Sequence, residues 1–152
     1  MIVGVAFHTL AAVIWVGGMF FAYMILRPSV GSLEPVIRLP LWHRVFSRFF
    51  AWVWLSVAIL LLSGFAMVLV ALGGFLAVGA YVRAMMALGI VMVTIYTYLY
   101  FVPWQRFRRA VSIQDWPAAN AALQRMRFIV GVNLSSAWLP SRLARAAGTM
   151  DK

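Results

Sequence analysis

The sequence predicts an all-α fold, a single transmembrane domain over residues 1–152 built as an integral membrane bundle of four transmembrane helices with a short fourth helix. Two observations predict this fold. The chain is 65% hydrophobic and only 11% charged, with a mean hydropathy of +0.96, whereas a soluble domain carries about 25% charged residues. The few charges lie between long uncharged runs, which is how membrane proteins place them.

The first uncharged run predicts a transmembrane helix over about residues 2–26. A span needs about 20 residues, because the hydrocarbon core is about 30 Å thick and each helical residue rises about 1.5 Å. Arg27 and Pro28 end this helix, since proline disfavours the helical conformation in the residue before it. Residues 29–48 carry charges and two further prolines, and they predict a hydrophilic connection.

The second uncharged run, residues 49–82, is too long for one ordinary span. Gly73 and Gly74 offer a turn within it. The run therefore predicts two helices, over about 47–72 and 81–102.

The fourth helix is predicted over about 118–145, after an Asp115-Trp116-Pro117 sequence that is typical of an N-cap followed by an early proline. Only residues 128–141 of it are uncharged, which is short for a span. The helix crosses the bilayer if its arginines extend toward the two interfaces, and a re-entrant or interfacial segment is the alternative. These arginines are Arg125, Arg127, Arg142 and Arg145.

Arginine counts predict the orientation. The first and third connections carry most of the arginines, and the middle one offers only Arg83, so both termini are expected on the periplasmic side of a bacterial inner membrane. The expected partner is the lipid bilayer, and a homo-oligomer stays open. Nucleic acid is not expected, because a net charge of +10 would need a solvated basic face to bind it.

Residue types that are missing narrow the chemistry. There is no cysteine, which excludes thiolate metal sites and iron–sulfur clusters. No acidic residue lies inside the predicted spans, so hydrolysis by paired carboxylates and a carboxylate proton relay are not expected. Whether the chain is an enzyme stays open.

His8 is the main candidate for a functional residue, because an ionisable side chain inside an apolar span is costly and by default marks a functional site. The alternative is a neutral histidine that only holds helices together, for example by a hydrogen bond to Ser63 or Asn133. His43 lies in a basic, aromatic stretch and is expected at the membrane surface. The two histidines are expected on the order of 20 Å apart, too far to share one iron.

Three methionines are expected at the depth of His8: Met67 near the end of the second helix, and Met85 and Met86 at the start of the third. Imidazole with soft thioethers suits Cu(I), and a histidine–methionine pair also suits haem iron. The alternative is that these methionines fill gaps in a packed core. Each helix also carries glycines that permit close approach of a neighbour: Gly17 and Gly18, Gly64, Gly89, and Gly131.

The stretch FHTLAAVIWVGG (residues 7–18), followed by Leu-Arg-Pro at 26–28, resembles the first helix of the CopD family of bacterial inner-membrane proteins, which is associated with copper resistance and uptake. The matching positions are His8, Trp15, Gly17, Gly18, Arg27 and Pro28. The same arrangement is similar to that of HemJ-type protoporphyrinogen oxidases, four-helix membrane proteins associated with haem. Those proteins rely on a lysine in a later helix, whereas the one lysine here is Lys152.

The resemblance implies a membrane protein that handles copper or binds haem b through His8, for metal transfer or electron transfer. It also implies a periplasmic copper or redox partner, and an enzyme of this kind would be a membrane haem oxidoreductase. In the copper version, His8 with Met67, Met85 and Met86 holds Cu(I) near the periplasmic side.

In the haem version, His8 is the axial ligand, and Trp15, Gly17 and Gly18 shape the cofactor pocket. A different class of function is a structural or adaptor subunit without metal, in which His8 serves helix packing alone.

Overall fold

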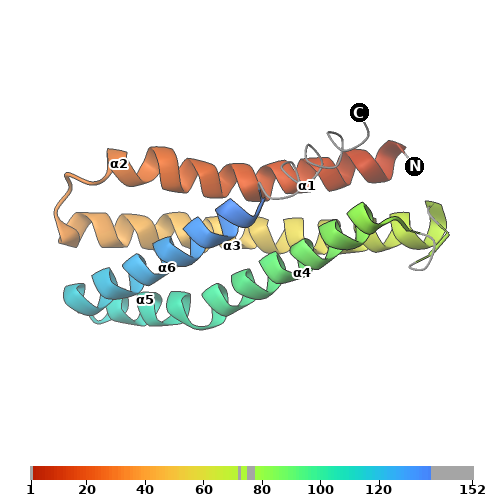
Figure 1. Cartoon of the computed structure of the whole chain (residues 1–152). Coiled ribbons are helices and arrows are strands. Elements are labelled where there is room, and N and C mark those ends of the chain that lie inside the picture. The colour runs from red at the N-terminus through yellow and green to blue at the C-terminus, as the bar shows by residue number, and fades with distance from the viewer. Residues whose placement is uncertain (1, 72, 75–77, 138–152) are drawn as a thin grey trace, which may run out of the picture.

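Helices make up nearly all of the computed structural model, which describes residues 2–71, 73–74 and 78–137, and no strand occurs in these ranges (Figure 1). Three stretches, Ile2–Ser29, Pro35–Val70 and Ala80–Ser112, are long and apolar enough to cross a membrane. The all-α membrane bundle predicted from the sequence is confirmed. The elements in chain order are α1 (Ile2–Phe20), η1 (Phe21–Leu26), α2 (Arg27–Ser29), α3 (Pro35–Ala66), η2 (Met67–Ala71), α4 (Ala80–Phe101), α5 (Pro103–Ser112) and α6 (Trp116–Ala137).

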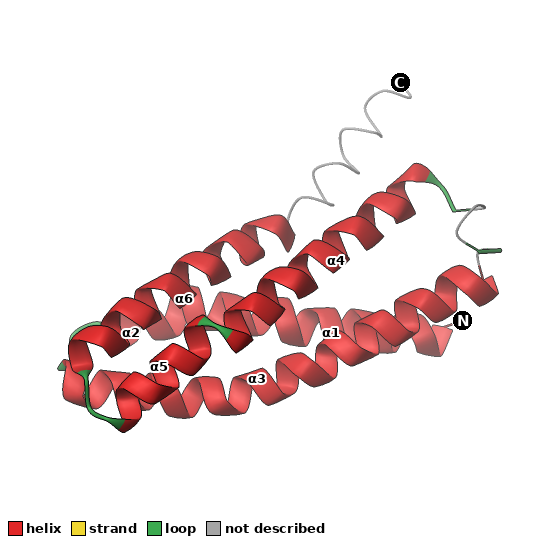
Figure 2. Cartoon of the chain, turned by 90° about the horizontal axis from the view of Figure 1, so that it is seen from below, coloured by secondary structure: helices red, strands yellow, loops and turns green. Residues whose placement is uncertain are grey.

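The first hairpin pairs α1 with α3 in antiparallel directions, and α6 returns along the bundle to pack on α4, α5, α3 and α1 (Figures 1 and 2). The start of α1, the end of α3 and the start of α4 lie at one end of the bundle, named here the α1 end. The connection 30–34 and the turn between α5 and α6 lie at the opposite end, named here the α5 end (Figure 1).

The first span does not stop at residue 26 but continues through a π-helical segment, η1, into α2. The N–H of Arg27 bonds the carbonyl of Ala22, five residues back. Because Pro28 has no N–H and its ring crowds the preceding turn, this wider turn lets the helix continue through the proline. The hydroxyl of Ser29 then donates to the Ile25 carbonyl at 2.7 Å.

The second span begins at Pro35, whereas the charges and prolines of residues 29–48 predict a connection there and a helix start near 47. Proline is well suited to the first helical position. Every third or fourth residue of the added helix is buried: Leu39, Trp42 and Phe46 are 0%, 2% and 4% exposed. An amphipathic helix therefore replaces the expected connection, because its apolar stripe has α5 and α6 to pack against.

The third span matches its prediction, because α4 runs from Ala80 to Phe101 and Pro103 begins a new helix. The basic stretch beyond it is helical as well, since Trp104, Phe107 and Ala110 form a buried stripe on α5.

The N-cap predicted at Asp115 is confirmed, because its Oδ1 accepts the N–H of Ala118 at 3.0 Å. The helix that follows, α6, is described from Trp116 to Ala137. The remainder of the fourth predicted helix, to residue 145, lies outside the described residues. That this helix crosses the membrane stays a prediction.

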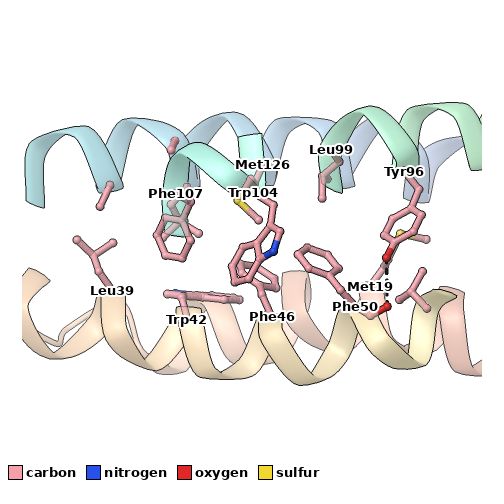
Figure 3. Packing of buried hydrophobic residues seen from close by; sticks show 14 of the residues in the cluster. Met19, Leu39, Trp42, Phe46, Phe50, Tyr96, Leu99, Trp104, Phe107 and Met126 are labelled. Carbon is pink, nitrogen blue, oxygen red and sulfur yellow. Dashed lines mark hydrogen bonds between the residues drawn. The ribbon is translucent and has the colours of Figure 1, made fainter. Parts of the chain in front are cut away.

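Aromatic side chains form most of the core toward the α5 end (Figure 3). Trp42 stacks on Phe46 with ring centroids 4.8 Å apart, and Phe50 meets Trp104 edge-on at 5.1 Å. The hydroxyl of Tyr96 donates to the Phe50 carbonyl at 3.2 Å. Phe50 thus joins α3 to both α4 and α5.

Replacing Phe50, which is 4% exposed, should therefore destabilise the bundle strongly. We expect Phe50→Ala to lower the free energy of unfolding by about 3 kcal/mol, because it leaves a cavity between three helices. Phe128→Ala is the matched control, since Phe128 is 74% exposed, and it should change the value by less than about 1 kcal/mol. Equilibrium unfolding in detergent micelles measures both, and equal losses would contradict this account of the core.

Candidate functional site

A pocket of about 460 Å³ lies between α1, the end of α3 with η2, and the first half of α4. This volume lies within the range of about 300–1,000 Å³ that is usual for small-ligand sites. Apart from the imidazole, its walls are mostly aliphatic side chains and thioethers. Seven of the residues singled out from the sequence line it: His8, Trp15, Gly64, Met67, Met85, Met86 and Gly89. The structure thus brings the histidine and all three candidate methionines to one cavity.

His8 is held from one side by Ser63 of α3, with 2.8 Å between its Nδ1 and the serine Oγ. The Ser63 hydroxyl also lies 2.5 Å from the Ile59 carbonyl, to which it donates. A hydroxyl has one hydrogen, so with that hydrogen on Ile59 the Ser63 oxygen accepts the N–H of His8 Nδ1. The other ring nitrogen, Nε2, then carries the lone pair, which is the form of histidine that binds metals.

Gly64, the residue after Ser63, lies at the contact between α1 and α3. A Cβ at Gly64 would lie 3.5 Å from Cε1 of His8, so the imidazole lies directly against this glycine. Of the two partners predicted for His8, Ser63 is the one observed. Asn133 instead donates to the sulfur of Met19 at 3.8 Å.

The methionines differ in exposure. Met85 is 42% exposed at the rim of the pocket, whereas Met67 and Met86 are half-buried. Met67 is the first residue of the π-helical segment η2, a type of turn that occurs often at functional sites. A fourth methionine, Met92, also lines the pocket and is 8% exposed. In the sequence, Met92 follows Met85 by two helical turns and therefore lies on the same face of α4. This spacing is the signal that could have placed Met92 in the site.

The indole of Trp15 closes the inner end of the pocket. It is 4% exposed and meets the ring of Tyr96 edge-on, with centroids 6.0 Å apart. Trp15 thus extends from α1 and packs against α4.

Gly17 and Gly18, expected to shape a cofactor pocket, do not line this cavity. A Cβ at Gly17 would meet nothing within 4 Å, but one at Gly18 would collide with the ring of Phe49 on α3. Gly18 thus permits the packing of α1 on α3 in this structure. Gly17 faces neither α3 nor the pocket.

His43 lies toward the α5 end, far along α3 from Ser63. Its ring stacks on Trp104 with centroids 5.3 Å apart and an interplanar angle of 23°. Because α1 and α3 are antiparallel, His8 and His43 belong to opposite ends of the bundle. They do not form one site.

The donor set of the pocket decides which metal it fits. Over the described ranges 2–71, 73–74 and 78–137, no group of three or more His, Cys, Asp or Glu side chains could hold a metal ion. The pocket offers one imidazole and several thioethers, all uncharged. Such soft, neutral donors match Cu(I) and not a hard divalent ion.

A family model described as copper resistance protein D matches residues 43–139 of the chain, which is more than half of its 152 residues. The matched region includes most of α3 and all of α4, α5 and α6, and hence Ser63 and the pocket methionines. It does not include α1 with His8. The chain matches no curated protein and no solved structure at a significant level.

The two neighbouring glycines of α1 should respond differently to substitution. We expect Gly18→Ala to lower the free energy of unfolding by about 1–3 kcal/mol, since Phe49 must move to make room. Gly17→Ala should be neutral or slightly stabilising, because its methyl group meets nothing and alanine favours the helix. Unfolding in detergent micelles compares them, and equal effects would show that α1 is rotated from the orientation described.

Proposed function

Because the chain belongs to the copper resistance protein D (CopD) family, we propose that it is a copper-handling membrane protein that takes Cu(I) as cargo in the pocket beside His8. One observation carries the proposal: the imidazole of His8, bonded through Nδ1 to Ser63, shares one cavity with Met67, Met85 and Met86. The neighbouring methionine Met92 is a further candidate donor.

The electrostatics of the bundle support a singly charged cation at this place. The pocket walls carry no carboxylate, so a doubly charged ion would have little to offset the cost of leaving water. Cu(I) carries one charge and is bound well by neutral sulfur and nitrogen. Ser63 holds the imidazole through its other nitrogen, which is the usual way in which a second residue orients a metal-binding histidine.

The exposed fractions of the methionine side chains support a route by which Cu(I) enters the pocket. Met85 is at the rim and Met92 is buried, so an ion can pass from an exposed thioether to enclosed donors without losing all its ligands at once. Most of the arginines lie toward the other end of the bundle. By the positive-inside rule the pocket then opens toward the periplasmic side of a bacterial inner membrane, where both termini lie and a periplasmic copper partner would meet it.

Anaerobic titration of the detergent-purified protein with Cu(I), in competition with a chromogenic Cu(I) chelator, tests the proposal. We expect His8→Ala to abolish stoichiometric binding. Ser63→Ala should weaken binding by about 10–100-fold, the usual effect of removing a residue that orients a metal ligand. Met85→Leu and Met86→Leu should each weaken it with little change in volume.

Two control variants accompany these. Met24→Leu removes an exposed thioether outside the pocket, and His43→Ala removes the other imidazole. Both should bind Cu(I) as the unmodified protein does. Unchanged binding in His8→Ala would overturn the copper proposal. A haem absorption band that disappears in His8→Ala would make haem the ligand instead. A protein with neither ligand, in which His8→Gln is silent, would be a structural or adaptor subunit.

A further inference from the structure

Three arginines from three different elements gather toward the α5 end of the bundle, away from the copper pocket: Arg27 of α2, Arg38 of α3 and Arg127 of α6. An Nη of Arg38 lies 3.4 Å from the side-chain oxygen of Asn120 on α6. In return, the guanidinium of Arg127 lies over the ring of Trp42 on α3, 5.5 Å from its centroid. Arg27 and Arg38 are close enough for their charges to act on the Arg127 guanidinium.

Arg27 is tied to the same place through Tyr23. Its guanidinium lies over the Tyr23 ring, 5.1 Å from the centroid. That ring in turn packs against Gly131 of α6, where an added Cβ would lie 3.6 Å from it. Gly131 is one helical turn beyond Arg127. The first span, α3 and α6 therefore each present a guanidinium to one junction.

Arg38 donates from its two Nη atoms to the Gly31 carbonyl and to Asn120, but other donors of this junction have no acceptor. Four buried side-chain nitrogen or oxygen atoms have no hydrogen-bond partner in the described part of the chain, and three of them are N–H donors of this group: Nε of Arg38, Nε of Arg127 and Nε1 of Trp42. Within the same described residues no carboxylate forms an ion pair with these arginines. Buried donors without acceptors are costly, and three such donors beside partly buried like charges fit an anion from outside the chain.

The chemistry of the group selects the anion. Guanidinium groups bind phosphate with two parallel hydrogen bonds and high geometric preference. Arg27 ends the span Ile2–Ser29, which places the junction at the depth of lipid headgroups. The neighbouring side chains of Phe21 and Met24 are 51% and 54% exposed, and they offer an apolar surface for acyl chains.

We propose that Arg27, Arg38 and Arg127, with Trp42, form a binding site for the phosphate group of an anionic phospholipid between α2, α3 and α6. The bound headgroup would hold α6 against the first hairpin. Basic pockets between transmembrane helices are a recognised way of binding anionic lipids. A soluble phosphate shares the same chemistry, and the experiment below separates the two sources.

The full-length protein is delipidated in a neutral detergent and titrated with phosphatidylglycerol, with phosphatidylcholine or with inorganic phosphate. Bound lipid is counted by native mass spectrometry, and stability is followed by thermal unfolding. We expect phosphatidylglycerol to bind saturably and to raise the unfolding temperature. Phosphatidylcholine and inorganic phosphate at the same concentration should have little effect. Stabilisation by inorganic phosphate alone, with none added by phosphatidylglycerol, would overturn the lipid as ligand.

The variant Arg38→Gln/Arg127→Gln tests the residues, and Arg108→Gln/Arg109→Gln is the control, since it removes the same charge from the exposed face of α5. The first should lose affinity for phosphatidylglycerol by about tenfold or more, and the control should keep it. Equal losses in both would show attraction to total charge and no site. If the first variant does not fold, Arg127→Lys keeps the charge without the planar fork; it should weaken binding, and unchanged binding would overturn the proposal.

Discussion

A polar side chain that lies inside lipid needs a hydrogen-bond partner, and the rest of this structure depends on how His8 obtains one. Its Nδ1 lies 2.8 Å from Ser63 on the neighbouring α3, and its ring lies against Gly64, the next residue of that helix. The serine hydroxyl also donates to the Ile59 carbonyl, and with its one hydrogen there its oxygen accepts from Nδ1. A contact that joins α1 to α3 thereby also orients the imidazole that we propose as a copper ligand.

The two ends of the bundle differ in packing and in charge. Toward the α5 end, aromatic side chains pack around Phe50 of α3 and Trp104 of α5. The arginines of three elements lie at the same end. Toward the α1 end, aliphatic side chains and thioethers leave a cavity open beside His8. The packed core at the α5 end holds the helices together, so that the less tightly packed α1 end can contain a pocket. The same division keeps most of the positive charge away from a cationic cargo.

The uncharged runs predicted the transmembrane helices well, because hydropathy and the length of a span leave little freedom. The same reasoning misjudged residues 35–48 and 103–112, where charges and prolines suggested connections. Both segments are helical because Leu39, Trp42 and Phe46, and likewise Trp104 and Phe107, recur at the spacing of a buried helical face. A search for uncharged runs therefore does not detect amphipathic helical segments at the ends of the spans.

Parts of the site were predictable and parts were not. The histidine, its partner Ser63 and the three methionines could be placed at one depth from the sequence, since antiparallel helices fix depth. The rotation of each helix could not. Gly17 and Gly18 are adjacent, yet they point about 100° apart on a helix, and only Gly18 meets α3. Met92 was left out of the predicted site, although its spacing places it on the same face of α4 as Met85.

X-ray absorption spectroscopy of the Cu(I)-loaded protein tests the central claim most directly, because it reports which atoms contact the metal. The account predicts one imidazole nitrogen together with thioether sulfur, with the sulfur signal reduced in Met67→Leu, Met85→Leu or Met86→Leu, and bound copper lost in His8→Ala. Copper bound only by oxygen and nitrogen, or a spectrum that none of these variants alters, would contradict it.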